Sequence, residues 1–447
     1  MTGSRSSTVP QTRLVMSRAS RPLRRCALAL AAVVLATTPL SAQRAPRAAK
    51  PLRHGFAVDR LARIDSMLDA AVAQDEIAGA VALVLRDDQV VYERAVGWSD
   101  REAQRRMTPD AVFRIASQSK ALTSTAVLML LEEGRLTLAT PASRFLPSFA
   151  RTTVATRTDT GVAIVPARRA ITIRDLLTHT AGISYGMDAS VRARYEPMGL
   201  GPAAGFGWYT ADKSEPVCTT MDKLGTLPFV AQPGEAWVYG YNTDILGCIV
   251  ERASGMPLDT FLRTRITQPL GMRDTHFFLP VAQRTRLVTV YANDSGRVRR
   301  ASDGARGQGH YVDGPRVSFA GGAGLVSTAR DYARFLQMIA HGGRWNSQQY
   351  LAPHTVALMT TNQVGTLHGT TTGFGLGFET TERYGATGSS SVGTFGWGGA
   401  YGSNYKVDPA EGLVIVFMIN QLPSGTDVVG RFQTMLYSAL VDARAMR

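Results

Sequence analysis

Two segments rich in strand-forming residues lie near opposite ends of this 447-residue chain. The first, GAVALVLRDDQVVYERAVGWSD at residues 79–100, has two runs of β-branched and apolar residues on either side of Asp87 and Asp88, which predicts a hairpin. The second, YGSNYKVDPAEGLVIVFMINQ at residues 401–421, predicts two more strands around a Pro-Ala-Glu-Gly turn. Because both pairs are local hairpins, we expect one mostly antiparallel sheet assembled from the two ends of the chain.

Helical patterns account for most of the remaining sequence. Residues 58–74, VDRLARIDSMLDAAVAQ, carry apolar residues at helical spacing. Residues 121–134, ALTSTAVLMLLEEG, are apolar on nearly every side, which is typical of a helix enclosed by protein and ending at Gly134. Further helices are expected to begin at the capping pairs Thr172 with Asp175 and Thr328 with Asp331, and after Asp427.

The middle of the chain differs in composition from its ends. From residue 141 to residue 290 Pro and Gly are frequent, strand patterns are hard to find, and the apolar spacing predicts short helices. We therefore predict an α+β fold. In it, residues 55–145 and 291–447 form an α/β domain whose antiparallel sheet is flanked by helices, and residues 146–290 form an inserted, mostly helical domain.

The positive charge is concentrated in an N-terminal tail. The formal net charge is +14, but residues 1–54 contain ten Arg and Lys and no Asp or Glu, which leaves +4 for residues 55–447. This balance gives no reason to expect a nucleic-acid partner. Arginines before CALALAAVVLATTPL (26–40) and small residues after it have the pattern of a signal peptide.

The predicted signal peptide covers residues 1–43, and residues 44–54 would form a flexible mature N-terminus. Its apolar run is about 15 residues long, where a membrane span needs about 20. We therefore expect an exported protein, periplasmic or extracellular, with no integral membrane association after the signal peptide is removed. The oligomeric state stays open.

Two cysteines, Cys218 and Cys248, remain after such cleavage. They could form a disulfide in an exported protein, but Cys248 lies in the apolar helical stretch DILGCIVERA, which favours a buried free thiol. The spacing of cysteines and histidines matches no metal site, so we expect no metal and no cofactor.

The stretch FRIASQSKAL (113–122) places Ser117 and Lys120 one helical turn apart, although the chain contains only five lysines. An N–H at the start of a helix favours developing negative charge, and burial of an amine disfavours its charged form, so Lys120 could accept the proton of Ser117. The alternative is an N-cap serine beside a lysine that reaches solvent. A second S-x-x-K, at Ser403 and Lys406, falls in a predicted strand, where residues three apart point to opposite faces.

Two further stretches favour the catalytic interpretation: PGEAWVYGYNTDILG (233–247), in which Tyr239 precedes a helix, and GTFGWGGAYG (393–402), a glycine-rich strand edge. Together with Ser117 and Lys120, they resemble the three motifs of the serine β-lactamase and penicillin-binding-protein superfamily, class C branch, and most closely its family VIII carboxylesterases. The resemblance extends over residues 55–447 and implies an α/β sandwich of the β-lactamase type.

The resemblance also implies a mechanism. Ser117 would attack an acyl carbonyl to form an acyl-serine, while Lys120 and Tyr239 share the proton transfers and water later releases the acyl group. The backbone N–H groups of Ser117 and Ala400 would form the oxyanion hole. The residues expected to contact substrate are Tyr241, Trp397, Gly398 and Gly399.

Two departures from the lactam-processing pattern point to the substrate. Trp397 stands where such enzymes carry Lys or His, and Tyr241 stands where they carry Asn, although Asn242 is adjacent. An apolar ring suits an uncharged group, so we expect a carboxylesterase acting on a small-molecule ester. The alternatives are a β-lactamase or D,D-peptidase acting on a β-lactam or cell-wall peptide, an acyltransferase, and an acyl-binding receptor without turnover.

Two other patterns could suggest a different hydrolase. Residues 182–186, GISYG, fit the nucleophile elbow of α/β-hydrolases, but they follow a predicted helix instead of a buried strand. His179 and His310 could suggest a Ser-His-Asp triad, but a structural role for His179, late in a short helix, fits the sequence better.

Overall fold

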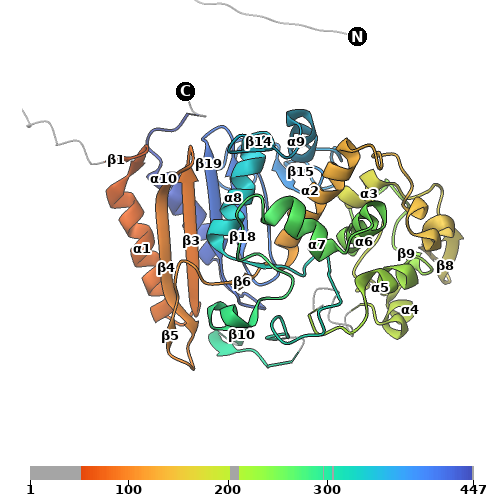
Figure 1. The fold of residues 1–447 in the computed structure, drawn as a ribbon, viewed down its shortest axis with the longest axis horizontal. Helices are drawn as coiled ribbons and strands as arrows, with labels where there is room; N and C mark the ends of the chain where they lie inside the picture. Colours follow the sequence, from red (N-terminus) through yellow and green to blue (C-terminus); the bar gives the residue numbers. More distant parts are fainter. Residues whose placement is uncertain (1–51, 202–210, 295, 305–306, 445–447) are drawn as a thin grey trace, which may run out of the picture. The chain divides into compact units, whose positions relative to one another are not determined.

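An eight-stranded antiparallel sheet joins the two ends of the chain (Figure 1). The computed structural model describes residues 52–201, 211–294, 296–304 and 307–444. The strands of this sheet, in spatial order, are β15 Thr372–Phe374, β16 Glu379–Thr381, β17 Phe395–Gly398, β18 Asn404–Asp408, β19 Leu413–Met418, β3 Gly79–Arg86, β4 Gln89–Asp100 and β5 Arg105–Arg106. Strand β19 pairs with β3 from Leu413 opposite Arg86 to Met418 opposite Val81, which confirms the predicted antiparallel sheet.

Both predicted hairpins of this sheet are present. Asp87 and Asp88, which connect β3 to β4, have φ angles of 47° and 64°. A two-residue turn with positive φ at both positions matches the twist of the flanking strands, and aspartate is among the residues that tolerate it. Pro409–Gly412 connects β18 to β19 in the same way that the sequence predicted.

The remaining helices and smaller strands lie outside this sheet. The helices are α1 Val58–Ala73, α2 Ser119–Glu132, α3 Ile173–Leu177, α4 Arg192–Tyr195, α5 Val217–Leu224, α6 Asn242–Ser254, α7 Leu258–Leu262, α8 Ala329–Ala340, α9 Pro353–Thr360 and α10 Val428–Ala439. Short 3-10 turns cover Ala116–Gln118, Ala142–Arg144, Pro147–Arg151, Glu196–Met198 and Val281–Arg286, and a π-helical turn covers Arg263–Thr267. The smaller strands pair as β1 Leu52–Arg53 with β2 Phe56–Ala57, β6 Phe113–Arg114 with β12 Val326–Ser327, β10 Tyr291–Asp294 with β11 Arg297–Arg300, and β13 Arg344–Trp345 with β14 Gln348–Gln349.

Helices cover both faces of the central strands. Alternate residues of β3 and β19, such as Ala82 and Phe417, pack with the buried faces of α1 and α10. The residues between them, such as Leu83 and Val416, pack with α2 and α8. Since successive residues of a strand point to opposite faces, both faces of these strands are buried, which explains their continuous apolar sequence.

The helix predicted to be enclosed by protein is α2. Its residues are buried from Ser119 to Leu130, and it ends before Gly134, whose φ of 71° is the left-handed conformation of a helix C-terminus. Ser117 was expected to start this helix, but it lies in the 3-10 turn Ala116–Gln118, and the α-helix begins at Ser119.

The predicted helical insert also contains strands. A three-stranded sheet of β8 Gly161–Pro166, β7 Thr153–Thr158 and β9 Pro228–Phe229 lies within it, although strand patterns were hard to find in this part of the sequence. Most residues of the β7–β8 hairpin are partly or fully exposed, and for that reason it lacks the apolar pattern by which strands are recognised. The boundaries 146 and 290 stay a prediction.

The prediction that residues 44–54 form a flexible N-terminus was wrong for the last residues of this segment. Residues 52–54 were expected to be flexible, but Leu52 and Arg53 form β1, which pairs with β2. The remaining residues 44–51 and the predicted signal peptide lie outside the described residues. In the described part of the chain, the helices are too short or too polar to cross a membrane.

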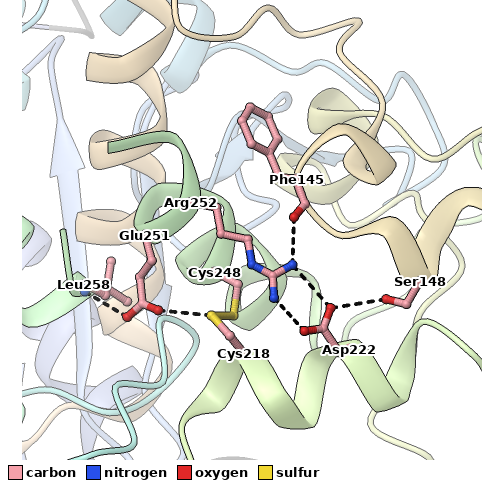
Figure 2. The surroundings of a disulfide bond; sticks show 8 residues. All are labelled: Phe145, Ser148, Cys218, Asp222, Cys248, Glu251, Arg252 and Leu258. Carbon is pink, nitrogen blue, oxygen red and sulfur yellow. Dashed lines mark hydrogen bonds and ion pairs between the residues drawn. A yellow bond between two sulfur atoms is a disulfide. The ribbon is translucent and has the colours of Figure 1, made fainter. Parts of the chain in front are cut away.

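Cys218 and Cys248 form a disulfide that joins α5 to α6, with their Cα atoms 5.3 Å apart (Figure 2). The interpretation of Cys248 as a buried free thiol was therefore wrong. Cys248 is 1% exposed, as an apolar helical position predicts, but α5 packs against this face of α6 and brings Cys218 to it. The positions of the two cysteines in the sequence did not indicate that they would be close in space.

A polar contact reinforces the same pair of helices (Figure 2). Arg252 on α6 donates to the Phe145 carbonyl at 2.7 Å and to the Asp222 carboxylate on α5, and Asp222 also accepts from Ser148 Oγ at 3.4 Å. At the preceding position of α6, the Glu251 carboxylate accepts the Leu258 N–H at 2.9 Å. Helix α6 is thus fixed to α5, and α6 begins directly after the Tyr239 motif.

Replacement of Cys218 and Cys248 by serine should lower the free energy of unfolding by about 3 kcal/mol, because the unfolded chain loses the cross-link between residues 30 positions apart. Urea unfolding of the wild type and the double variant measures this loss. Wild-type protein unfolded with a thiol reductant is the control and should match the variant. Equal midpoints for oxidised and reduced wild type would contradict the disulfide.

Candidate active site

Ser117 is held in place by the segment before it. Ala116 has a φ of 42°, in the left-handed region that a residue with a Cβ rarely adopts. The Asn420 side chain accepts the Arg114 N–H at 3.0 Å and donates to the Arg114 carbonyl at 3.0 Å, and the Ile115 N–H donates to the Leu325 carbonyl at 3.1 Å. These contacts hold the turn in a strained conformation of the kind that is common at functional sites.

Lys120 lies one turn further along and is 2% exposed. Its Nζ lies 3.3 Å from Ser117 Oγ and donates to the Gly322 carbonyl at 2.7 Å and to the Tyr185 hydroxyl at 3.1 Å. The structure therefore brings the predicted serine and lysine together, and Lys120 does not reach solvent as the alternative interpretation required. Ser117 is half-buried at the edge of a cavity.

Two tyrosines flank Lys120. The ring of Tyr239 lies 4.7 Å from Lys120 Nζ, measured to the ring centroid, and its hydroxyl accepts from Trp397 Nε1 at 3.1 Å. The phenol hydroxyl within hydrogen-bond distance of Lys120 Nζ is that of Tyr185. The two phenol rings meet edge to face at 5.7 Å.

Tyr185 is a site residue that the sequence did not reveal. It lies within GISYG, a segment considered only for Ser184. Tyr185 is far from Ser117 along the chain, and no sequence pattern indicates that the two are close in space. Burial raises the pKa of the Tyr185 hydroxyl well above its usual value. The hydroxyl is therefore neutral at neutral pH, so it can accept from Lys120 while keeping its own proton to donate.

His179 supports the Tyr239 ring and does not contribute to a triad. It is buried against Tyr239 and Trp237, with ring centroids 4.8 and 5.8 Å away. The Asn242 amide donates to its Nδ1 at 2.9 Å, and burial lowers the pKa of His179 well below its usual value, so the ring is neutral. The predicted structural role fits this position. His310, in contrast, is exposed beside Asp212.

A cavity of about 490 Å³ opens above Ser117. Tyr185, Tyr239, Trp397, Gly398, Gly399 and Ala400 are among the residues that line it. A Cβ on Gly399 would lie 2.6 Å from the Ile115 carbonyl oxygen, so glycine permits β17 to approach the Ser117 turn. This approach brings the backbone of Ala400 and Ser117 to one cavity, where both N–H groups could bind an oxyanion.

Tyr241 is not among the residues lining the cavity. It is 2% exposed, its hydroxyl accepts the Gly201 N–H at 3.1 Å, and its ring packs edge to face on Tyr185 at 4.9 Å. Tyr241 thus lies behind Tyr185. Its ring can support the Tyr185 ring, which separates Tyr241 from the cavity.

Neither of the two rival motifs forms a serine–lysine pair or a nucleophile elbow, although Lys406 also lines the cavity. Ser403 Oγ donates to the Ile419 carbonyl at 2.7 Å, whereas Lys406 Nζ donates to the Thr387 carbonyl at 2.7 Å, so these side chains point apart. Ser184 Oγ accepts the Gly186 N–H at 3.1 Å within a loop. In the described ranges, the structure contains no group of three or more His, Cys, Asp or Glu side chains placed to bind a metal.

The fold and the serine–lysine pair define a serine hydrolase. The model of the Beta-lactamase family matches residues 64–439, and the chain belongs to this family. This result confirms the resemblance inferred from the three motifs, together with the predicted fold. Assignment to the class C branch stays a prediction.

Known relatives include esterases. Esterase EstB from Burkholderia gladioli is 32% identical over 384 residues, which cover 81% of this chain and 91% of EstB. The lovastatin esterase of Penicillium rubens is 31% identical over 342 residues, 70% of this chain and 82% of that enzyme. Among solved structures, EstCE1, a hydrolase with promiscuous acyltransferase activity, matches with a TM-score of 0.72 and 28% identity, covering 86% of this chain and 99% of EstCE1.

Substitution of Tyr185 by phenylalanine should reduce kcat/KM by about 10- to 100-fold, because Lys120 loses a hydrogen-bond partner in a buried site. Tyr239→Phe should reduce it by about 100-fold or more, since the predicted role of this phenol is to exchange protons with the reacting atoms. Steady-state kinetics on a chromogenic ester measures both. The exposed Tyr384→Phe is the matched control. A Tyr185→Phe enzyme as active as this control would remove Tyr185 from the site.

Proposed function

We propose that this protein is a carboxylesterase that cleaves small, uncharged esters through an acyl-serine. The main support is the position of Ser117 Oγ, 3.3 Å from Lys120 Nζ, at a cavity whose walls contain Tyr239 and Trp397. A serine hydroxyl becomes a useful nucleophile only beside a base of this kind.

In acylation, Ser117 Oγ attacks the ester carbonyl carbon while its proton passes to the Lys120–Tyr239 pair. The carbonyl oxygen becomes an oxyanion, which the Ser117 and Ala400 N–H groups can stabilise. Collapse of this intermediate breaks the bond to the alcohol oxygen, which takes the proton from the pair. Because the Lys120 amine lies 4.7 Å from the centre of the Tyr239 ring, we assign proton transfer to the pair and not to one member.

In deacylation, the same groups act on water. The pair takes a proton from a water molecule, whose oxygen attacks the acyl carbon, and the proton then returns to Ser117 Oγ as the acid leaves. Tyr185 can hold the Lys120 amine in position throughout, because its hydroxyl stays neutral and within 3.1 Å.

Trp397 supports an uncharged substrate. Its indole N–H donates to the Tyr239 hydroxyl, so this side chain positions Tyr239 and offers an apolar ring to the cavity where lactam-processing enzymes carry a cation. EstB and the lovastatin esterase, both named as esterases, agree with this assignment.

Acyl transfer to an alcohol is the second candidate. EstCE1, whose structure this chain resembles, is described as a hydrolase with promiscuous acyltransferase activity. An acyl-serine can be released by an alcohol as well as by water, so the two reactions share every residue named above and differ only in the acceptor.

We also propose that the protein is exported, to the periplasm or beyond the cell. The support is the disulfide between Cys218 and Cys248 together with the predicted signal peptide, since structural disulfides persist in oxidising compartments. Fractionation of cells expressing the full chain should recover the protein outside the cytoplasm. Retention in the cytoplasm would contradict this assignment.

Purified protein should hydrolyse p-nitrophenyl butyrate, and Ser117→Ala should reduce this rate by about 1,000-fold or more, because no acyl-serine can form. The control is Ser184→Ala, which removes the serine of the GISYG segment and should retain most activity. A chromogenic cephalosporin tests the lactam alternative. Faster turnover of the cephalosporin than of the ester would overturn the proposal, as would loss of activity in Ser184→Ala alone.

A further inference from the structure

Lys120 is enclosed by protein, and its hydrogen-bond partners among the described residues are uncharged: Ser117, Tyr185 and the Gly322 carbonyl. Transfer of an ion from water into a protein interior is unfavourable unless an opposite charge compensates it. When a buried base gains a proton during the reaction, its new charge has the same unfavourable free energy. The structure around Lys120 should therefore contain a compensating carboxylate.

Asp244, in the first turn of α6, is in the position to provide it. It is 2% exposed, and its Oδ1 accepts the Gly322 N–H at 3.0 Å. The carbonyl of the same glycine accepts from Lys120 Nζ at 2.7 Å. One residue thus contacts the carboxylate through its N–H and the amine through its C=O.

This contact requires glycine at position 322. A Cβ there would lie 2.7 Å from Asp244 Oδ2 and 3.1 Å from Oδ1. The preceding Gly321 is similarly confined, since a Cβ on it would lie 2.7 Å from the Thr243 carbonyl, and its own carbonyl accepts from Thr123 Oγ1 at 2.9 Å. The segment therefore passes between α2 and α6 with space for backbone only, which keeps Asp244 close to Lys120.

Among the described residues, the ionisable groups beside Lys120 are His179, which burial keeps neutral, and the phenols Tyr185 and Tyr239. Around Asp244 they are Lys120, Lys213 and the phenols Tyr185 and Tyr241.

Burial holds the pKa of Asp244 above its usual value, and the positive charge of Lys120 is the largest of the influences that oppose this rise. The two groups therefore interact electrostatically as well as through Gly322. This interaction favours the charged forms of both, so it should be strongest when Lys120 holds a proton.

We propose that Asp244 is a positioning residue for the acyl-transfer reaction: it fixes the Gly322 backbone that binds Lys120, and it supplies the negative charge that stabilises Lys120 in its protonated form. The role rests on the proposed serine hydrolase function and deepens it. Asp244 does not line the cavity and acts only through Lys120.

The first test is Asp244→Asn, which keeps an oxygen to accept the Gly322 N–H but removes the charge. The limb of the kcat/KM pH profile that reports the catalytic base should move to lower pH, because the protonated base loses its stabilising negative charge. This direction holds whether activity requires the neutral or the protonated amine. The rate at the optimum should also fall by about 10-fold, with the loss mainly in kcat.

Asp175→Asn is the matched control. Asp175 is also buried, but its partner is Arg169, at 2.6 Å, in the capping region of α3. Its loss should reduce stability without moving either limb of the profile. If Asp244→Asn lowers the rate and leaves both limbs in place, its role is structural only, and the proposal is overturned.

The second test does not depend on activity. Urea unfolding compares wild type, Asp244→Asn, Lys120→Met and the double variant. Asp244→Asn should destabilise the wild type strongly, because the buried Lys120 amine loses its compensating carboxylate, and should destabilise the Lys120→Met protein much less. Equal losses in the two backgrounds, or failure of Asp244→Asn to fold in both, would overturn the proposal. If the wild type had no esterase activity, the proposed function would be refuted. The unfolding comparison of the four proteins would still test the interaction of Asp244 with Lys120.

Discussion

The arrangement of the site depends on how the amino group of Lys120 is held inside the protein. Its partners come from three separate parts of the chain: Ser117 from its own turn, Tyr185 from the loop after α3, and the Gly322 carbonyl from the segment before β12. A flexible lysine side chain reaches solvent unless such partners compensate for its lost hydration. Once they do, the amine is fixed beside the hydroxyl that it can deprotonate, and Tyr239 packs its ring over the same amine.

Close backbone approach makes this enclosure possible. Gly322 has no room for a Cβ beside the Asp244 carboxylate, and Gly399 has none beside the Ile115 carbonyl. The first contact places a carbonyl acceptor on Lys120, and the second brings the end of β17 to the Ser117 turn. The glycines are therefore structural requirements of the chemistry, because a larger residue at either position would separate two elements that must touch.

Local features of the chain were predictable because their causes are local. The β3–β4 and β18–β19 hairpins, the capping box of Thr172 and Asp175, and the enclosed helix α2 each depend on residues close in sequence. The β7–β8 hairpin was missed because its residues are largely exposed and carry no apolar alternation. The Cys218–Cys248 disulfide was misjudged because it depends on how α5 packs against α6.

The sequence by itself determined the pairing of Ser117 with Lys120, since one helical turn separates them, and the antiparallel hairpins of the central sheet, since each is a short continuous segment. Only the tertiary structure decided that Tyr185 contacts Lys120 and that Tyr241 packs behind the Tyr185 ring. It also decided that Asp244 is connected to Lys120 through Gly322. The physical reason is distance along the chain. Contacts between segments tens to hundreds of residues apart are set by the packing of whole helices and strands, which no local pattern records.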